Sequence, residues 1–183
     1  MPYDPEIHHR RSIRLKEYDY SLEGAYFVTI CTHQKECLFG DITDAKMHLN
    51  QYGSIVQACW GDLPSHYPHV YLDESIIMPN HMHVIILIGP SDGGVGARHA
   101  LPLLGTIVGS FKSAVARKVN LLRHTPGYPV WQRNYYEHII RNDKSLEAIQ
   151  VYIQANPLYW AKDPDNPASI RKGEACLAPT SVP

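Results

Sequence analysis

The sequence predicts an α+β fold of the ferredoxin-like type, in which the element order βαββαβ forms an antiparallel sheet with two helices on one face. Three observations support this prediction. Strand-like runs rich in β-branched and aromatic residues alternate with runs in which apolar residues recur at helical spacing. Two of the strand-like runs are adjacent and joined by a tight-turn dipeptide. A further helical run follows the last strand, so the predicted domain carries an additional C-terminal helix.

The first half of the pattern contains four elements. Residues 25–32 (AYFVTICT) are dense in β-branched and aromatic side chains, which favours a strand. Apolar residues at helical spacing over 49–63 predict a helix. Residues 69–78 (HVYLDESIIM) and 81–88 (HMHVIILI) are strand-like, and the Pro-Asn dipeptide between them marks a turn. We therefore expect a β-hairpin.

The second half follows a glycine-rich stretch. An apolar stripe over 103–122 predicts a helix whose other face is polar and basic. Residues 130–142 (VWQRNYYEHIIRN) alternate as a strand. Asn142 or Asp143 is expected to cap a last helix, and Pro157 to mark its end.

Length and composition indicate one domain. A chain of 183 residues with 44% hydrophobic composition can bury a substantial core. We expect a basic arm over 1–24, a globular domain over 25–162 and a flexible tail over 163–183. The 17 Lys and Arg residues are balanced by 18 Asp and Glu residues, so any anion-binding surface must be local.

The cysteine pattern and the apolar runs indicate the cellular compartment of the protein. The four cysteines form no Cys-x-x-Cys pair, and the N-terminus lacks the pattern of a signal peptide. The longest apolar run is much shorter than the ~20 residues of a membrane span. These features predict a soluble, cytoplasmic protein with reduced thiols and no membrane contact.

Two histidines stand at the start of the predicted strand 81–88. Side chains alternate along a strand, so His81 and His83 face one side while Met82 faces the other. Imidazoles placed as next-but-one neighbours could hold a metal ion. They could equally form the polar border of an ordinary strand.

The last predicted helix presents a second candidate pair. Leu146, Ile149 and Ile153 form its apolar stripe, and Tyr152 and Asn156 lie on the flank. Residues four apart on a helix are neighbours, with Cβ atoms ~5–6 Å apart. One of the pair could be a nucleophile and the other a ligand beside it. Alternatively, the tyrosine lies at the border of the core and the asparagine serves the helix end.

These motifs together resemble a known family. The segments His81-Met82-His83, VWQRNYYEHIIRN and YIQANP, in this order, resemble the single-tyrosine HUH transposases, which are named for His-hydrophobic-His. The opening RRSIRLKEYDYSLEGAYFVTICT is similar to the REP-associated tyrosine transposase branch, whose members act near repetitive extragenic palindromes. The resemblance extends over about residues 10–160.

The resemblance implies roles for four residues. His81 and His83 match the paired metal ligands, Tyr152 matches the nucleophile, and Asn156 matches a third ligand that is glutamine in the insertion-sequence relatives. The implied cofactor is Mg²⁺ or Mn²⁺. The implied reaction is cleavage of single-stranded DNA near hairpins through a 5′-phosphotyrosine intermediate, followed by rejoining.

The implied partner is single-stranded or hairpin DNA, bound by a monomer or a homodimer. Phosphate contacts are expected from basic side chains. The N-terminal candidates are Arg10, Arg11, Arg14 and Lys16, and the weaker candidates are Lys112, Arg117, Lys118, Arg133 and Arg141. Glu137 and His138 are expected to reach the site from the strand before the last helix. Tyr135, Tyr136 and Tyr159 compete with Tyr152 as nucleophile.

Two other functions fit the same topology. One is a catalytically silent nucleic-acid-binding module in which sheet aromatics such as Tyr26, Phe27 and Tyr135 stack on bases. The other is a metal-dependent phosphodiesterase in which water replaces the tyrosine. The first predicts DNA binding without a covalent adduct, and the second predicts cleavage without one.

Overall fold

The computed structural model describes residues 24–89, 104–167 and 169. Its main sheet has four antiparallel strands in the order β4-β5-β1-β6. These are β1 (Gly24–Cys31), β4 (Val70–Ile77), β5 (His81–Ile88) and β6 (Tyr136–Ile140). The predicted N-terminal arm and the glycine-rich stretch lie outside the described residues.

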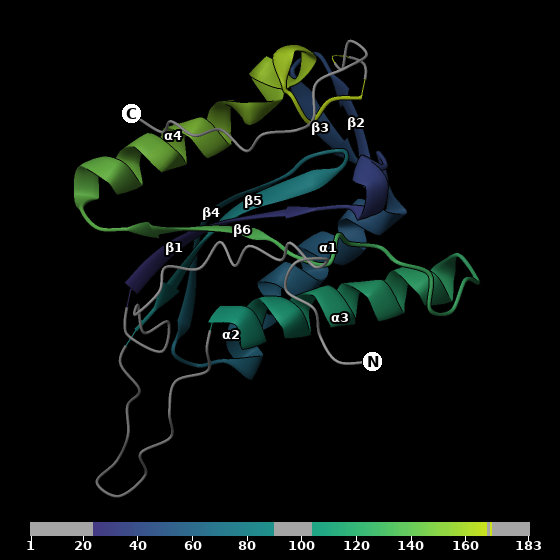
Figure 1. Cartoon of the computed structure of the whole chain (residues 1–183), viewed down its shortest axis with the longest axis horizontal. Helices are drawn as coiled ribbons and strands as arrows, with labels where there is room; N and C mark the ends of the chain where they lie inside the picture. The colour runs from purple at the N-terminus through teal and green to yellow at the C-terminus, as the bar shows by residue number, and fades with distance from the viewer. Residues whose placement is uncertain (1–23, 90–103, 168, 170–183) are drawn as a thin grey trace, which may run out of the picture.

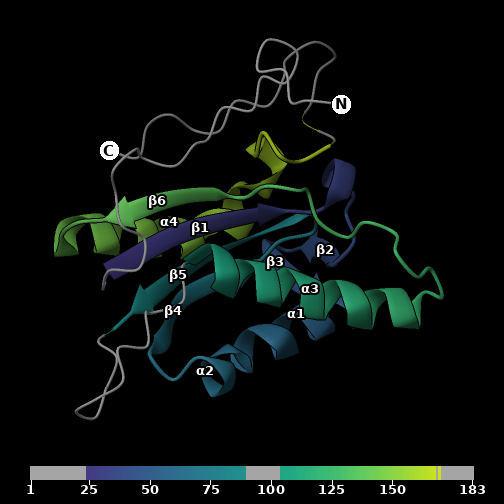
Figure 2. The same ribbon diagram turned by 60° about the horizontal axis from the view of Figure 1, so that its bottom comes forward.

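Helices cover both faces of this sheet. Helices α1 (Gln51–Gly61) and α3 (Leu104–Leu122) lie on one face, and α4 (Asp143–Tyr159) lies on the other (Figure 1, Figure 2). A short helix, α2 (Leu63–His66), follows α1. The predicted ferredoxin-like arrangement with an additional C-terminal helix is therefore confirmed.

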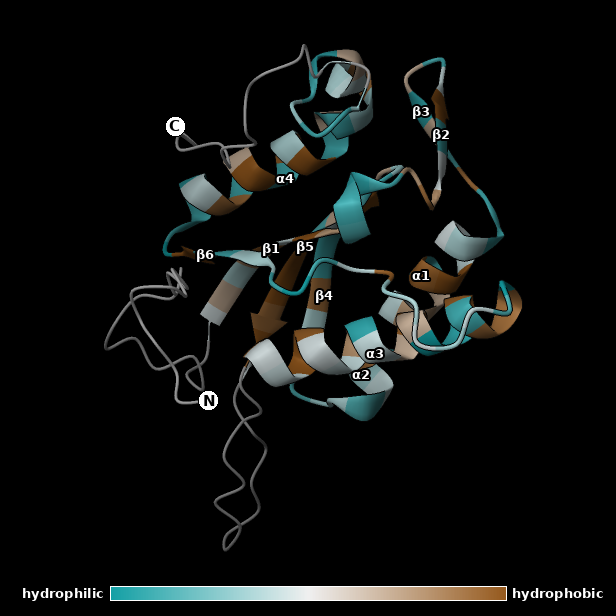
Figure 3. Cartoon of the chain, turned by 45° about the vertical axis from the view of Figure 1, so that its right-hand side comes forward, coloured by the Kyte–Doolittle hydropathy of each residue, from teal (hydrophilic) through white to brown (hydrophobic). Residues whose placement is uncertain are grey.

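Alternation along β1 divides the apolar residues between two cores. Tyr26, Val28 and Ile30 pack with the α1 and α3 side chains in the larger core. Phe27 points to the opposite face and packs with Ile85 of β5 and with the α4 side chains. Hydrophobic and hydrophilic residues alternate along α3 (Figure 3), and its buried residues belong to the larger core. No helix in the described part of the chain has the length and apolar character needed to cross a bilayer.

A second, two-stranded sheet was not predicted. Strands β2 (Gly40–Thr43) and β3 (Lys46–Leu49) form a hairpin beside the C-terminal end of α4 (Figure 1). Each strand has only four residues, and apolar and polar side chains alternate only weakly along it. The sequence of this region therefore looks like that of a loop. Asn50 then caps α1 by accepting from the backbone N–H groups of Tyr52 and Gly53, so the helix begins after residue 50.

Two predicted boundaries are wrong. The strand expected over 130–142 forms only as β6, because the Lys112 ammonium group takes the backbone carbonyls of residues 132–134. Pro157 does not end the last helix but lies inside it, and η2 (Trp160–Lys162) continues from its end. A proline lacks only its own N–H, so this helix loses one internal hydrogen bond and continues.

Polar contacts tie α4 to the edge strand β4. The β4–β5 register shifts between Leu72 and Ser75, which marks a β-bulge. The two acidic residues in this bulge accept from α4: Asp73 from Gln150 at 2.8 Å and Glu74 from Gln154 at 3.1 Å. These bonds fix the position of α4 along the sheet, in addition to its apolar stripe.

Replacing Gly53 by alanine should destabilise the protein, although alanine is the better helix former. A β-carbon at Gly53 would overlap the Phe39 carbonyl oxygen and lie 2.9 Å from Leu49 Cδ2. We expect a loss of about 1–3 kcal/mol in the free energy of unfolding. Gly109→Ala in α3 is the control, because nothing lies within 4 Å of that position. It should gain up to about 1 kcal/mol. Urea unfolding measures both, and equal effects would contradict this account of Gly53.

Candidate active site

The two histidines open the central strand β5 on the face that α4 covers. His81 pairs with Cys31 and His83 with Thr29 in the β1–β5 register, while Met82 joins the core on the other face. The side chains are 1% and 5% exposed, and their ring centroids lie 4.6 Å apart. The predicted shared face is therefore confirmed, and both rings are buried. A polar strand border would be exposed to water.

Each imidazole is held through its Nδ1 atom. His83 Nδ1 lies 2.8 Å from Thr29 Oγ1, and His81 Nδ1 lies 2.9 Å from Asn80 Oδ1. When Nδ1–H donates in these bonds, the lone pair of a neutral ring is on Nε2. Metal-binding histidines are oriented in the same way by a partner on the other nitrogen.

Helix α4 brings Tyr152 and Asn156 to the histidines. The Tyr152 hydroxyl lies 3.4 Å from His83 Nε2, and the two ring centroids are 5.2 Å apart. Phe27 supports both rings, stacking on His83 at 5.4 Å and packing against Tyr152 in a T-shaped arrangement at 6.2 Å. Asn156, one turn later, is 4% exposed. The structure therefore gathers all four residues that the sequence singled out.

Two buried polar atoms at this site lack a hydrogen bond of normal geometry in the described part of the chain: His81 Nε2 and Asn156 Oδ1. The Asn156 amide is nevertheless close enough to raise the pKa of His81 and to lower that of Tyr152. A buried polar atom left unpaired costs about 1–3 kcal/mol. An electron-pair acceptor placed between these atoms would remove that cost.

Burial keeps both imidazoles neutral. It lowers the pKa of His81 to about 4, against the smaller opposing influence of the Asp165 carboxylate. Burial also lowers the pKa of His83 well below its ordinary value, and the neighbouring His81 lowers it further. Both rings therefore offer lone pairs at neutral pH, as metal coordination requires.

The pKa of Tyr152 is shifted in the opposite direction to those of the histidines. Burial raises the pKa of the Tyr152 hydroxyl, and the carboxylates of Asp163 and Asp165 raise it further, while Asn156 lowers it. The side chain is still 41% exposed, so the ring is open to solvent on one side. The hydroxyl is protonated at neutral pH, and a cation is needed to stabilise the phenolate.

The donor set fits a divalent metal ion. The amide oxygen is a ligand typical of Mg²⁺ or Mn²⁺, and the two neutral imidazole nitrogens also suit softer ions. No group of three His, Cys, Asp or Glu side chains suited to a metal ion occurs within 24–89 and 104–167. The third ligand must therefore be an amide such as Asn156, or come from outside this set.

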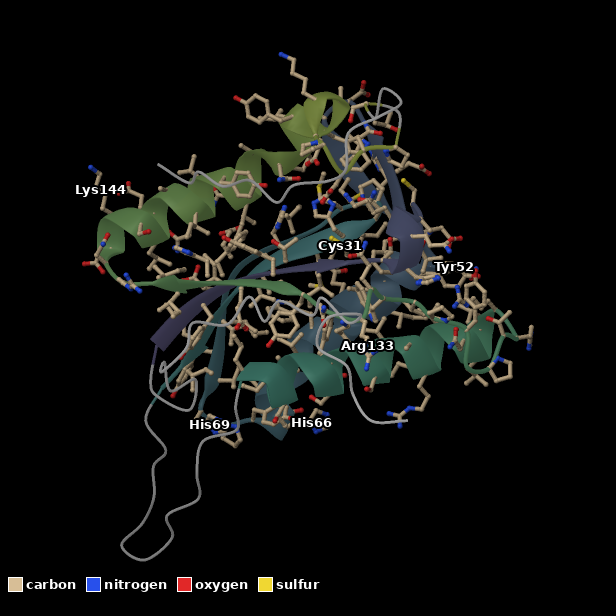
Figure 4. All side chains as sticks on the ribbon, viewed as in Figure 1. Cys31, Tyr52, His66, His69, Arg133 and Lys144 are labelled. Atoms are coloured by element: carbon tan, nitrogen blue, oxygen red, sulfur yellow. The ribbon has the colours of Figure 1, made fainter. Side chains whose placement is uncertain are left out.

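Residues 163–167, which follow the tyrosine helix, pack beside the histidines. Lys35 Nζ and Asp165 Oδ1 form an ion pair at 2.5 Å, and Asn80 Nδ2 donates to the Asp165 carbonyl at 2.6 Å. Cys31, at the end of β1, lies 3.9 Å from the same carboxylate and is labelled in Figure 4. This segment belongs to the predicted tail, yet its first residues contact the sheet.

Those predicted basic residues that the structure describes do not gather at the site. Lys112 is engaged with the backbone at 132–134, and burial lowers its pKa. Arg117 and Lys118 are exposed on α3, on the opposite face of the sheet from α4, and Arg117 lines an open groove of about 630 Å³. Arg133 and Arg141 are exposed. The four arm residues lie outside the described residues.

The two further candidates on β6 point to different faces. His138 pairs with Phe27 and so faces α4, but β1 lies between its strand and the strand of the histidines. Glu137 pairs with Val28 and so faces the layer of α1 and α3. The expectation that both reach the site is wrong for Glu137, because adjacent residues on a strand point to opposite sides.

The competing aromatics are placed elsewhere. Tyr135 packs against the larger core, Tyr136 packs on Phe27, and Tyr159 is 63% exposed near the end of α4. Tyr26 and Phe27 are 0% and 4% exposed, so they cannot stack on bases as the silent binding module requires. In the described part of the chain, Tyr152 is the tyrosine whose hydroxyl meets the histidine pair.

Sequence reasoning missed Asn80, Thr29 and the two aspartates after α4. Asn80 precedes His81 directly, but it was interpreted only as a turn residue. Thr29 looks like an ordinary β-branched strand residue, and only the β1–β5 register reveals its partner. The aspartates lie in a segment whose composition suggested a loose tail.

Acidification should destabilise the protein through His81. The pKa of His81 is about 4 in the fold and ~6.5 in an unfolded chain, so the unfolded chain binds more protons between these values. The free energy of unfolding should therefore fall as pH drops from ~6.5 towards 4, on the order of 3 kcal/mol for this group. Urea unfolding in EDTA measures it. His81→Gln should reduce the slope, whereas exposed His124→Gln should keep it, and equal slopes would contradict the assignment.

Comparisons with known proteins support the predicted resemblance. No family model matches the chain. It is 46% identical over 176 residues to an uncharacterized protein of Haemophilus influenzae, covering 88% of this chain and 95% of that protein. It is 27% identical over 141 residues to another protein of that organism, named "Putative REP-associated tyrosine transposase", covering 76% and 73% of the two chains.

A solved structure shows the shared fold. It is described as a REP-associated tyrosine transposase bound to a REP hairpin, and it matches with a TM-score of 0.52 at 17% identity. The match covers 79% of this chain and 73% of that one. The chain thus belongs to one family with the Haemophilus influenzae protein that is 46% identical to it, and in sequence and fold it resembles the REP-associated tyrosine transposases.

Proposed function

We propose that this protein is a metal-dependent endonuclease and strand transferase that acts on single-stranded DNA near hairpins, in the manner of REP-associated tyrosine transposases. The observation that carries the proposal is the convergence of unpartnered ligand atoms beside a tyrosine hydroxyl. His81 Nε2 and Asn156 Oδ1 lack a hydrogen bond of normal geometry in the described part of the chain, and His83 Nε2 faces Tyr152. A protein of this fold binds a REP hairpin, which supports DNA as the proposed substrate.

His81, His83 and Asn156 would hold Mg²⁺ or Mn²⁺. The bound ion supplies positive charge to the scissile phosphate and to the developing phenolate. Two imidazoles and one amide leave room for phosphate oxygens and water. Thr29 and Asn80 contribute by keeping the imidazole Nε2 lone pairs turned to the site.

Tyr152 is the proposed nucleophile. Its oxygen attacks the phosphorus atom, the P–O3′ bond breaks, and the departing 3′ oxygen ends as a hydroxyl. One phosphodiester bond is exchanged for another, so a DNA 3′-hydroxyl can reverse the step without an external energy source. In the structure the hydroxyl contacts His83 Nε2, and it must leave this contact because the same nitrogen is a proposed ligand.

The environment of Tyr152 makes its reactivity conditional. Burial and the carboxylates of Asp163 and Asp165 raise the pKa of the hydroxyl, so the tyrosine is unreactive as it stands. T-shaped packing against Phe27 holds the ring beside His83. These surroundings therefore favour attack by the Tyr152 hydroxyl when a cation and a phosphate are both bound beside it.

Tyr152→Phe removes only the hydroxyl group, so the fold and hairpin binding should survive while the covalent adduct and strand cleavage disappear together. The measurement is denaturing electrophoresis after incubation with labelled single-stranded hairpin DNA and Mn²⁺. Tyr159→Phe is the matched control, because it lies on the same helix and is 63% exposed. An adduct that persists in Tyr152→Phe would reassign the nucleophile. Cleavage by the wild type with no adduct would favour a water-dependent phosphodiesterase, and binding without either would favour a silent module.

His81→Ala and His83→Ala should each abolish cleavage and weaken Mn²⁺ binding by at least about tenfold, because each removes a proposed ligand. Asn156→Ala should have a smaller effect, since water can replace a neutral oxygen ligand. Mn²⁺ affinity is measured by electron paramagnetic resonance without DNA. Exposed His124→Ala should match the wild type. Unchanged Mn²⁺ binding and cleavage in the His81, His83 double variant would refute the metal site.

A further inference from the structure

Asn80 is a completely buried side chain in the turn between β4 and β5, and every polar atom of its amide is used. Its Nδ2 donates to the Lys35 carbonyl at 3.2 Å and to the Asp165 carbonyl at 2.6 Å. Its Oδ1 lies 2.9 Å from His81 Nδ1. One amide thus joins η1 (His33–Lys35), the segment after α4, and the first histidine.

These bonds define how the amide is turned. Backbone carbonyls accept hydrogen bonds and cannot donate, so the NH₂ group of Asn80 must face Lys35 and Asp165. The carbonyl oxygen is then left to face His81, and it too can only accept. Nδ1 of a neutral His81 must therefore carry the proton, which leaves the lone pair on Nε2.

Contacts with η1 and the residue before it hold Asn80 in place. Gln34 and Lys35 both adopt left-handed backbone conformations, with φ of 53° and 57°, and in this kink the Lys35 carbonyl meets Asn80. Non-glycine residues occupy this region at an energetic cost, and such strain concentrates at functional sites. The Asn80 carbonyl in turn accepts from the backbone N–H and the hydroxyl of Thr32, at 2.8 and 2.9 Å.

The remaining contact comes from the segment that follows the tyrosine helix. The ion pair between Lys35 and Asp165 brings the Asp165 carbonyl to Asn80. Asn166, which is buried, donates to the Trp160 carbonyl and so ties the segment to the end of α4. The end of the helix that carries Tyr152 is thereby connected to His81 through a single side chain.

We propose that Asn80 is a positioning residue that presents His81 Nε2 to the site and couples this presentation to the docking of residues 163–167. The inference deepens the proposed function, on which its metal-binding part rests. Coupling between two contacts of one amide is reciprocal. Displacement of the segment after α4 therefore loosens His81, and disturbance of the Asn80–His81 contact loosens that segment.

Two substitutions of similar size separate the two roles of Asn80. Asn80→Asp keeps an acceptor for His81 Nδ1 but cannot donate to the carbonyls of Lys35 and Asp165. Asn80→Leu removes both functions. Asn120→Leu is the matched control, because Asn120 is also a buried asparagine. It lies near the C-terminal end of α3, where it binds the Tyr128 carbonyl and Arg123, outside the histidine site.

Three measurements on the full chain decide the proposal. Long-range proton–nitrogen NMR at pH 8 in EDTA reports which nitrogen of His81 carries the proton. Amide hydrogen exchange at Asp163, Asp165 and Asn166 reports the docking of residues 163–167, because the other two residues are prolines. Titration with Mn²⁺ alone reports the affinity of the ligand set. Circular dichroism and thermal unfolding confirm that each variant is folded.

We expect the wild type and Asn80→Asp to keep the proton on His81 Nδ1, and Asn80→Leu to populate the other tautomer. Exchange over 163–167 should rise in both variants, and Mn²⁺ affinity should fall about 10–100-fold in Asn80→Leu and much less in Asn80→Asp. Asn120→Leu should change none of the three.

An Nδ1–H tautomer that persists in folded Asn80→Leu would overturn the positioning role. Unchanged exchange over 163–167 in both Asn80 variants would overturn the coupling. The tautomer and exchange measurements need neither DNA nor metal. Absence of Mn²⁺ binding by the wild type would therefore refute the proposed metal site, while the spectra alone decide the role of Asn80.

Discussion

The site depends on the packing of α4 against the face of the sheet that carries the histidines. Phe27 and Ile85 from the sheet meet Ile149 and Ile153 from the helix, and glutamines on α4 bind the acidic residues of the β4 bulge. The apolar contacts set the distance between the layers, and the polar contacts set the position along the sheet. Without this layer, His81 and His83 would be two exposed imidazoles on an open face of the sheet, with ordinary pKa values and no tyrosine beside them. Burial by α4 is what makes both rings neutral and brings Tyr152 to within 3.4 Å of His83 Nε2.

The same burial places polar groups where water cannot reach them to form hydrogen bonds. Thr29 and Asn80 satisfy the Nδ1 atoms, but His81 Nε2 and Asn156 Oδ1 stay unpaired in the described part of the chain. Each such atom lowers stability by about 1–3 kcal/mol, which the two apolar cores must offset. A protein that used this face only for packing would gain stability from apolar side chains at these positions. The arrangement is therefore understandable as a ligand set that is completed by something else, and the carboxylates near Tyr152 favour a cation in that place.

The polar network around Asn80 shows how distant parts of the chain meet at one point. Lys35 lies in a left-handed kink after β1, His81 begins β5, and Asp165 follows α4, yet one buried amide binds all three. In such a network the orientation of each group is dictated by the others, so a change in one element is felt by the rest. The helix that carries the tyrosine and the strand that carries the histidines are thus linked by hydrogen bonds as well as by packing.

The sequence alone predicts the order of the four main-sheet strands and the three long helices, the shared face of the histidines, and the pairing of Tyr152 with Asn156, because these follow from local periodicity: two residues per repeat in a strand and 3.6 in a helix. It also carried the resemblance to REP-associated tyrosine transposases, which rests on motifs in a fixed order. The partners of these groups, by contrast, come from contacts between elements far apart in the sequence. That β6 is short follows from the Lys112 ammonium group across the fold, and the role of Thr29 follows from strand register. The orientation of His81 follows from contacts of Asn80 with residues 45 and 85 positions away along the chain. Such contacts arise between segments that no local pattern connects, so the chemistry of the site is set by the packing that brings those segments together.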